Sequence, residues 1–192
     1  DFMRDKPDNY YDLAIVDPPY GLGDKLTDGG TWASKYTSID SAWDVIPDES
    51  YFSELSRVAV SYIIWGGNNF SKYISPARCF IVWRKLQMLG MHTMADCELA
   101  LTSFDLNAKI YDGNNSQERI HPTQKPVALY RWLLKNYAKE GDKILDTHGG
   151  SFSSAIACHM EGFDLDICEL DEDYFNDAVK RFKLNTVQGR LF

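Results

Sequence analysis

The feature that most constrains this chain is a short apolar run that stops at two prolines. Residues 13–16 read Leu-Ala-Ile-Val and are followed directly by Asp17-Pro18-Pro19-Tyr20. A run of this length with β-branched residues predicts a strand buried on both faces of a sheet. The strand must end at Asp17, because neither proline has an N–H to donate to a neighbouring strand. The sequence therefore predicts a carboxylate, two rigid prolines and an aromatic ring at the carboxyl end of a core strand, where open α/β sheets bind ligands.

The chemistry of this strand end suits a planar ring that carries an exocyclic amine. Asp17 offers a group that only accepts hydrogen bonds, the prolines offer a fixed carbonyl, and Tyr20 offers a stacking face. The alternative is a strand that simply ends in a proline turn with Asp17 as its cap. Asp-Pro-Pro alone does not decide between these two interpretations.

Composition sets the class of protein. A chain of 192 residues that is 44% hydrophobic predicts one domain with a sizeable core. No apolar run reaches the ~18–20 residues of a membrane helix, and no signal peptide is visible, so we expect a cytoplasmic protein without membrane contact. Because the sequence begins at Asp1, we also expect a further amino-terminal piece and loops beyond those given.

The cysteines and the charge exclude two kinds of site. Four cysteines are scattered without a Cys-x-x-Cys pair, which predicts free thiols, no disulfide framework and no metal. The formal charge of −8 argues against bulk electrostatic attraction to nucleic acid. A nucleic-acid partner would therefore need a local basic surface.

The rest of the chain alternates between predicted strands and helices, which indicates an α/β fold. The predicted strands are residues 61–65, 79–83, 97–102, 143–146 and 164–169, and the predicted helices are 49–58, 126–137, 153–160 and a last one capped by Asp171. Strands separated by helices predict a mostly parallel sheet with helices on both faces, and two late strands close together predict an antiparallel edge. Residues 105–120 are polar and predict irregular structure.

A long polar loop is predicted directly after the Asp17 strand end, over residues 21–47. Its aromatic residues, Trp32 among them, either contact a base or anchor the loop to the core, and both interpretations stay open. Three further residues at predicted strand ends are candidates for substrate contact: Trp65, Arg84 and Lys85.

Residues 143–169 predict a strand, a tight turn, a helix and a second strand, with an acid at the end of each strand. The turn reads Asp146-Thr147-His148-Gly149-Gly150-Ser151, and its backbone N–H groups and helix start can approach a ligand. Glu169 suits the two hydroxyls of a ribose. Phe152 and Ser153 leave little room for a pyrophosphate, and Asp146 would repel one. A cationic nucleoside such as S-adenosylmethionine (SAM) fits better, although a plain α/β crossover remains the alternative.

A third motif lies between two prolines. His121-Pro122-Thr123-Gln124-Lys125-Pro126 places a hydroxyl, an amide and a cation on a stiff loop at a predicted helix start. Lys125 can pair with a carboxylate, such as the methionine end of SAM. The alternative is an ordinary helix entry with a solvated lysine.

Taken in order, these motifs and the segment Cys168-Glu169-Leu170-Asp171 resemble the amino-methyltransferases of DNA, in the β-type order where the catalytic motif precedes the cofactor motif. The resemblance spans nearly the whole chain and implies a Rossmann-like methyltransferase fold with permuted motifs. It implies that a flipped base is held by Asp17, Pro18, Pro19 and Tyr20. It further implies that SAM is held by Thr123, Gln124, Lys125, Glu169 and the residues of the Asp146–Ser151 turn.

The sequence departs from this family at the glycine turn and in its length. Thr147 and His148 stand where the family has Pro-Phe, and Phe152 stands where it has a last Gly. The segment between Tyr20 and His121 leaves little room for a target-recognition domain. We therefore expect a single catalytic domain over residues 1–192, with a catalytic half at 1–104 and a cofactor half at 121–192.

The resemblance implies an enzyme that flips a DNA base and methylates N6 of adenine, of a restriction-modification or phage type, without a metal. Asp at position 17 favours an amino-purine, whereas Ser is more usual for cytosine N4 and Asn for protein amides. Methylation of cytosine N4, RNA or a protein amide, or an inactive partner subunit, are the alternatives. A homodimer also stays open.

Overall fold

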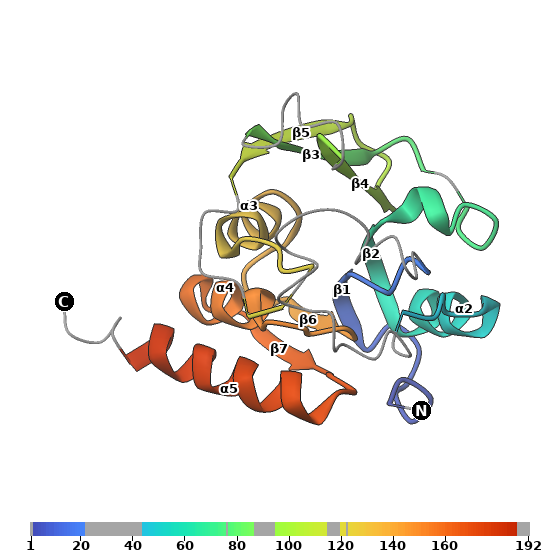
Figure 1. Cartoon of the computed structure of the whole chain (residues 1–192). Coiled ribbons are helices and arrows are strands. Elements are labelled where there is room, and N and C mark those ends of the chain that lie inside the picture. Colours follow the sequence, from blue (N-terminus) through green and yellow to red (C-terminus); the bar gives the residue numbers. More distant parts are fainter. Residues whose placement is uncertain are drawn as a thin grey trace.

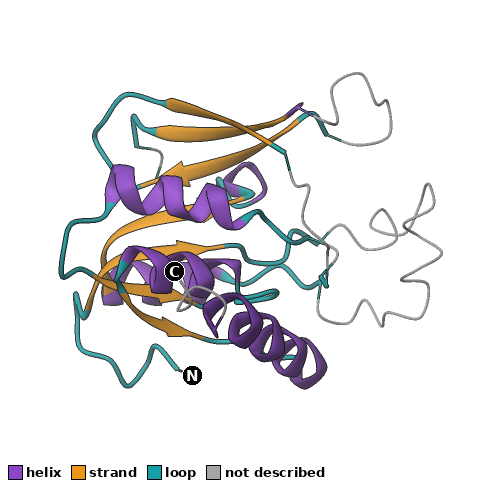
Figure 2. Ribbon diagram, turned by 90° about the vertical axis from the view of Figure 1, so that its left-hand side faces the viewer, coloured by secondary structure: helices purple, strands orange, loops and turns teal. Residues whose placement is uncertain are grey.

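The computed structural model describes residues 2–21, 44–75, 77–86, 95–114, 120–121 and 123–187. Most of the loop expected at 21–47, with Trp32, Tyr36 and Trp43, lies outside these residues. The described residues form a seven-stranded sheet in the order β5-β3-β4-β2-β1-β6-β7. Figures 1 and 2 show this sheet running through the molecule with helices packed against it.

The predicted core strand β1 (Tyr11–Val16) lies near the middle of the sheet. It pairs in parallel with β2 (Ala59–Trp65) and with β6 (Lys143–Asp146), and β6 pairs in parallel with β7 (Asp164–Ile167). Parallel strands bring their carboxyl ends to one edge of a sheet. This arrangement carries three segments that are far apart in the sequence to the same edge.

The antiparallel part of the sheet is interior, which corrects the prediction of an antiparallel edge. Strand β4 (Cys97–Thr102) pairs antiparallel with both β2 and β3 (Phe80–Lys85). Outside them, β5 (Lys109–Gly113) pairs in parallel with β3 and occupies the edge. Strand β5 lies in the segment 105–120, which was expected to be irregular. The sequence does not reveal this strand, because a short exposed edge strand needs few apolar residues.

Helices cover both faces of the sheet, as predicted (Figure 1). Helix α2 (Glu49–Val58) packs on one face through Phe52 and Leu55, while α3 (Val127–Tyr137) and α4 (Ser153–Glu161) pack on the other. Asp48 caps α2, since its Oδ1 accepts from Tyr51 N at 3.2 Å, and the predicted cap Asp171 is present, since its Oδ1 accepts from Tyr174 N at 2.9 Å. The second cap starts α5 (Glu172–Val187).

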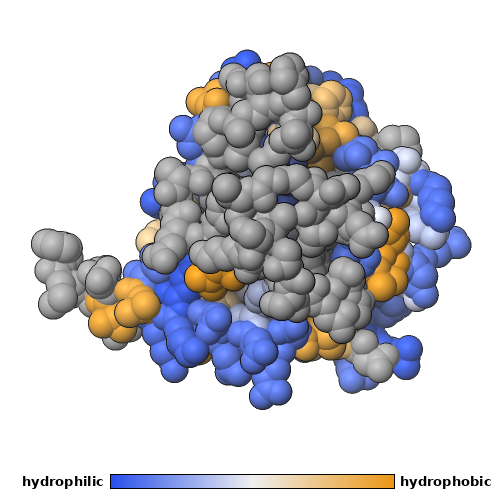
Figure 3. All heavy atoms as spheres, in the orientation of Figure 1, coloured by the Kyte–Doolittle hydropathy of each residue, from blue (hydrophilic) through white to orange (hydrophobic). Residues whose placement is uncertain are grey.

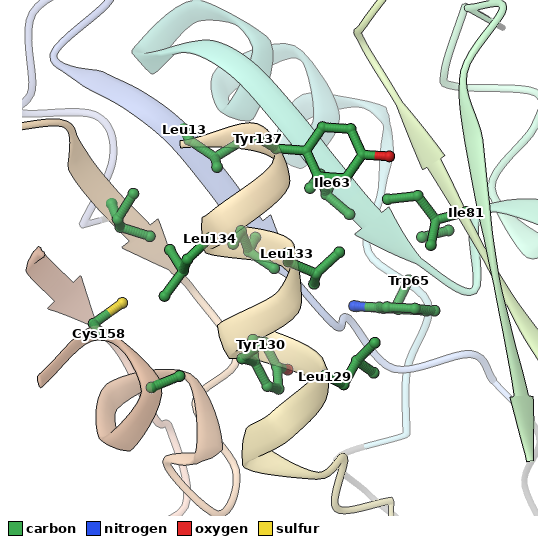
Figure 4. Close-up of a cluster of buried hydrophobic side chains, with 14 of the residues drawn as sticks. Leu13, Ile63, Trp65, Ile81, Leu129, Tyr130, Leu133, Leu134, Tyr137 and Cys158 are labelled. Carbon is green, nitrogen blue, oxygen red and sulfur yellow. The ribbon is translucent and has the colours of Figure 1, made fainter. Parts of the chain in front are cut away.

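The largest cluster of buried apolar residues lies between α3 and the sheet (Figure 4). Leu129 and Leu133 of α3 pack with strand residues that include Leu13 and Ile63, and all four side chains are at most 1% exposed. Burial of each such side chain stabilises the fold by roughly 1.5–3 kcal/mol. Packing of this kind fixes the start of α3, and hence the loop before it, at the edge where β1 and β6 end.

The last helix, α5, is mostly solvated. Its fully buried residue is Ala178, and Leu184 and Val187 near its end are exposed. Figure 3 shows hydrophilic surface along this helix and an apolar patch at its far end. None of the helices in the described ranges is long and apolar enough to cross a membrane.

Candidate active site

A cavity of about 920 Å³ opens at the carboxyl edge of the sheet, where β1, β6 and β7 end. Residues from all three predicted motifs line it. They are Asp17, Pro18, Pro19, Tyr20, Thr123, Gln124, Lys125, Thr147, His148, Gly149, Gly150, Ser151 and Glu169. The fold therefore gathers the candidate catalytic and cofactor residues around one space.

Asp17 and Tyr20 are bonded to each other at the end of β1. The Tyr20 hydroxyl donates to Asp17 Oδ1 at 2.6 Å. The Tyr20 ring lies directly over Gly66, where a Cβ would come within 2.1 Å of the ring, and Gly66 also has φ +65°. Glycine at position 66 thus gives the ring its space and adopts a conformation that side chains disfavour.

Lys125 reaches the same aspartate from the loop before α3. Its ammonium pairs with Asp17 Oδ2, lies 3.0 Å from Glu98 Oε2 and donates to the Tyr20 hydroxyl at 3.3 Å. The residue is 3% exposed. The partners of Lys125 in this structure are thus two protein carboxylates, while its predicted pairing with a cofactor carboxylate stays a prediction.

Glu98 is a site residue that the sequence interpretation missed. It lies on β4, and its Oε1 is 2.5 Å from Lys85 Nζ, while the 3.0 Å contact of Oε2 with Lys125 is an ion pair rather than a well-directed hydrogen bond. One sequence signal could have indicated Glu98: it is an acid inside the mostly apolar strand Cys97–Thr102, and a largely buried carboxylate requires a partner of opposite charge.

The charges of this cluster shift one another. Burial raises the pKa of Asp17, and the negative Glu98 adds to this effect, whereas Lys125 opposes it. Burial also acts to raise the pKa of Glu98, but the two ammonium groups outweigh it and lower that pKa to about 2. Burial acts to lower the pKa of Lys125, yet Asp17 and Glu98 raise it, so the lysine stays charged.

The glycine turn after β6 is built from backbone hydrogen bonds. Gly149 N donates to Cys168 O at 2.7 Å, and Asp146 Oδ1 accepts from His148 N at 3.0 Å. Asp146 Oδ2 accepts from Ser154 Oγ at 2.5 Å, and burial raises the pKa of this carboxyl to about 7. Asp146 is 1% exposed and lies beneath the cavity wall, where it holds the turn.

Glu169 is fixed at the cavity by two backbone donors. Its Oε2 accepts from Gly150 N at 2.7 Å and its Oε1 accepts from Asp171 N at 3.0 Å. Gly149 packs so closely here that a Cβ would lie 2.7 Å from the Phe152 ring. Phe152 itself has φ +57°, the conformation for which a glycine is usual.

Thr147 and His148, the two departures from the family pattern, tie the turn to α2. Thr147 Oγ1 lies 2.7 Å from the Tyr51 hydroxyl and 3.0 Å from His148 Nδ1. The His148 ring packs edge-on against Tyr51 with the ring centroids 5.4 Å apart. Burial lowers the pKa of His148 to about 4, so its ring is neutral near pH 7.

The loop from His121 to Lys125 is held by its own side chains. Thr123 Oγ1 lies 3.1 Å from His121 Nδ1, and the His121 ring packs against Tyr174 at 4.4 Å. Gln124 is 4% exposed, and its Oε1 accepts from Ile120 N at 3.2 Å. These contacts fix the direction in which Lys125 enters the cavity.

The four predicted candidates for substrate contact have different surroundings in the structure. Trp32 lies outside the described residues. Trp65 is 0% exposed, packs edge-on against Trp83 in the core and lies beneath Lys125, so it is covered in this structure, and its contact with substrate stays a prediction. Lys85 is bound to Glu98. Arg84 is half-exposed and donates to both oxygens of Asp112, at 2.7 and 2.6 Å.

Metal ligands are absent from the parts of the chain that the structure describes. No group of three or more His, Cys, Asp or Glu side chains there is arranged to hold an ion. The four cysteines are free thiols, of which Cys79 and Cys158 are buried.

The solved structures that share this fold include M1.HpyAVI and the PvuII DNA methyltransferase. M1.HpyAVI, solved as its SAM complex, aligns with a TM-score of 0.62 and 18% identity over 94% of this chain and 91% of that one. The cytosine-N4-specific PvuII DNA methyltransferase aligns with a TM-score of 0.63 and 10% identity over 96% of this chain and 86% of that one. The chain thus has the Rossmann-like methyltransferase fold that the resemblance implied.

Sequence comparison gives the family. The Type II methyltransferase M.HpaI of Haemophilus parainfluenzae is 25% identical over 229 residues, which cover 93% of this chain and 70% of that protein. The sequence model of the DNA methylase family N6_N4_Mtase matches residues 82–180, a segment that holds the Lys125 loop and the glycine turn. Because that segment is more than half of the sequence, this chain belongs to the DNA methylase family N6_N4_Mtase.

Proposed function

We propose that this chain is a SAM-dependent DNA methyltransferase that methylates the N6 amino group of adenine. One observation carries the proposal: Asp17 and Tyr20 line the same cavity as the glycine turn and the fixed carboxylate of Glu169. A group that accepts from an amine and a site for a nucleoside cofactor thus share one space.

The donor set fits SAM. Glu169 keeps lone pairs free for ribose hydroxyls after accepting one N–H at each oxygen. Gly149 and Gly150 line the cavity beside Glu169, and the acids near the turn favour a cation over a pyrophosphate. When bound, SAM supplies an electrophilic methyl group on a sulfonium. Thr123 and Ser151 lie on the same wall.

The chemistry assigned to Asp17 is to hold the amino group of a flipped base. The exocyclic nitrogen is a poor nucleophile because its lone pair is delocalised into the ring. Hydrogen bonds from its N–H groups to the Asp17 carboxylate and the Pro18 carbonyl favour a pyramidal nitrogen and stabilise the positive charge that develops during transfer. Asp17 accepts from Tyr20 at one oxygen and from Lys125 at the other, and each oxygen keeps a lone pair for an entering amine.

Tyr20 is proposed to stack on the flipped base. The hydrogen bond from its hydroxyl to Asp17 Oδ1 holds the ring next to the carboxylate, on the wall of the cavity. Stacking of this kind returns roughly 1–3 kcal/mol of the cost of extruding the base. Pro18 and Pro19 keep the segment rigid.

Cytosine N4 is the second candidate for the methylated group. Both bases present an exocyclic amine on an aromatic ring, and the fold is shared with an enzyme whose name specifies cytosine N4. We favour adenine because of the Asp at position 17. The proposal further places the reaction in the cytoplasm, in a restriction-modification or phage setting, with residues 1–192 acting as one catalytic domain.

Methyl-labelled SAM tests the proposal when it is incubated with the protein and either DNA or RNA of the same sequence. We expect label in DNA, without added metal and in the presence of a chelator. Label in RNA alone would show that the substrate is RNA and not DNA. Cofactor binding by calorimetry without any transfer would support the inactive partner subunit instead.

A further inference from the structure

Four charged side chains from four segments form a series of ion pairs in which negative and positive charges alternate. Asp17 follows β1, Lys125 precedes α3, Glu98 lies on β4 and Lys85 ends β3. Lys125 touches both acids, and Lys85 touches Glu98 at 2.5 Å. The side chains are 13%, 2%, 21% and 16% exposed in this order, so little solvent separates or screens them.

We propose that Glu98 and Lys85 are positioning residues that hold the Lys125 ammonium between the two acids and thereby set the charge of the Asp17 carboxylate. This inference deepens the proposed function and rests on it only for the role of Asp17 as the group that receives the amino nitrogen. Neither Glu98 nor Lys85 lies on the described wall of the cavity.

The sheet register fixes the outer pair. Strands β3 and β4 are antiparallel, with Trp83 opposite Glu98, and Lys85 N donates to Asp96 O at 2.8 Å. Lys85 and Glu98 are therefore diagonal neighbours on adjacent strands, a separation that long side chains span easily. Because Lys85 occupies Oε1, Glu98 turns its other oxygen towards Lys125.

The inner pair then depends on the outer one. Lys125 has three N–H donors and stands near Asp17, Glu98 and the Tyr20 hydroxyl. An ammonium that is 2% exposed needs these partners, because a buried charge without them is strongly unfavourable. Glu98 thus shares the cation with Asp17 and reduces the hold of Lys125 on the catalytic carboxylate.

Removing each outer charge has an opposite effect on Asp17. In Glu98→Gln, Lys125 pairs with Asp17 alone, so the pKa of Asp17 falls, and Lys85 can turn towards solvent. In Lys85→Met, Glu98 keeps one cation and its uncompensated charge draws Lys125 away, so the pKa of Asp17 rises. The signs follow from Coulomb's law for charges a few ångströms apart.

The other groups that face Asp17 are unchanged in both variants. They are Tyr20 on the same segment, Tyr51 on α2, Tyr130 on α3 and Asp146 at the end of β6. A loss of packing alone would move Asp17 in the same direction in both variants. Opposite shifts therefore separate electrostatic positioning from a structural role.

The matched control is Glu161→Gln. Glu161 on α4 is also an acid between two cations, 2.5 Å from Arg131 and 3.3 Å from Lys135, and its side chain is 14% exposed. It lies outside the described wall of the cavity. This variant removes an equivalent charge without touching the series of ion pairs that contains Asp17.

The experiment is a carboxyl ¹³C NMR titration of aspartate-labelled protein without DNA or cofactor, with the Asp17 signal assigned by its loss in Asp17→Asn. We expect the Asp17 titration to move to lower pH in Glu98→Gln and to higher pH in Lys85→Met, and to stay in place in Glu161→Gln. An unchanged titration in both test variants, or shifts in the same direction, would overturn the proposal. Amide spectra report folding, and if Glu98→Gln does not fold, Lys85→Met decides by its sign.

Kinetics give a second readout. In Glu98→Gln, Lys125 pairs with Asp17 alone and competes with the amino group for this carboxylate. We therefore expect kcat for methyl transfer to fall by about tenfold, less than the 10²–10³-fold loss of a direct transition-state partner. The KM for SAM should be unchanged. A change confined to the KM for SAM would contradict the assignment. Because the titration needs no turnover, absence of activity in the wild-type protein refutes the proposed function and leaves this inference to the titration.

Discussion

The two sides of the cavity are built in different ways. On the side proposed to hold SAM, called the cofactor side, the glycine turn and Glu169 are held mainly by backbone N–H groups close in sequence or on paired strands, such as Gly150 N on Glu169. On the side proposed for catalysis, called the catalytic side, Asp17 is held by Lys125, which lies 108 residues away in the sequence, and through it by Glu98. Most side-chain substitutions leave the backbone donors in place. Removing one charge from the series Asp17, Lys125, Glu98 and Lys85 changes the ion pairs of the remaining residues. The cofactor side should therefore respond gradually to mutation and the catalytic side abruptly.

The largest effect is expected for Asp17→Ala. Loss of the acceptor for the amino group should reduce methyl transfer by at least ~10²-fold, in the range found for single transition-state hydrogen-bond partners. The affinity for SAM should stay within error of wild type, because Glu169 and the turn are untouched. Rates from labelled SAM and affinities from calorimetry measure the two quantities.

Retention of near-normal turnover by this variant would remove Asp17 from the catalytic role. Loss of SAM affinity together with turnover would show instead that the two sides of the cavity are one unit. The fold should persist, since Lys125 keeps Glu98 as a partner.

Glu169→Ala tests the cofactor side. Losing charge-assisted hydrogen bonds to the ribose should weaken SAM binding by about 1–3 kcal/mol, or roughly 5- to 150-fold in Kd. Glu140→Ala, an exposed acid outside the cavity, serves as the control and should bind normally. An unchanged Kd in Glu169→Ala would place the ribose elsewhere.

The pH dependence of stability sharpens the role of His148. The pKa of His148 is about 4 in the folded protein, compared with 6.5 for an unperturbed histidine. Between pH 6.5 and 4 this residue is therefore protonated in the unfolded chain and neutral in the folded protein. Stability from this residue is therefore lost as the pH falls from 6.5 to 4. The fall in Tm over this window should be shallower in His148→Asn than in wild type.

His121 shifts in the same direction and Asp146 in the opposite one, and both remain in this variant. The exposed His159 gives the control His159→Asn, which should follow the wild-type curve. A wild-type slope in His148→Asn would mean that its ring is protonated in the folded state.

The smallest effect concerns DNA. Arg84 is a half-exposed candidate for substrate contact, and a true phosphate contact contributes about 0.9 to the slope of log affinity against log salt. Arg84→Ala should flatten the slope by about that amount. An identical slope would leave Arg84 as the structural partner of Asp112.

Much of this architecture could be predicted from the sequence because its signals are local. The run before Asp17, the turn at 146–151 and the Asp171 cap each follow from neighbouring residues, and the structure has all three. The resemblance added the family, which the match over residues 82–180 supports.

What could not be predicted depends on distant partners. Glu98 is an ordinary strand residue until the sheet order places β4 near the Lys125 loop, and Trp65 is at a strand end that proves to be covered. Strand β5 is visible only through its pairing with β3. Side-chain contacts between segments far apart in sequence carry no periodic signal, so they require the structure.

The most direct test of the account is the identity of the methylated base. DNA containing all four bases is incubated with the wild-type protein and deuterated-methyl SAM, digested to nucleosides and separated by chromatography with mass detection. The account predicts labelled N6-methyladenine that disappears in Asp17→Ala. Labelled N4-methylcytosine in its place would contradict it.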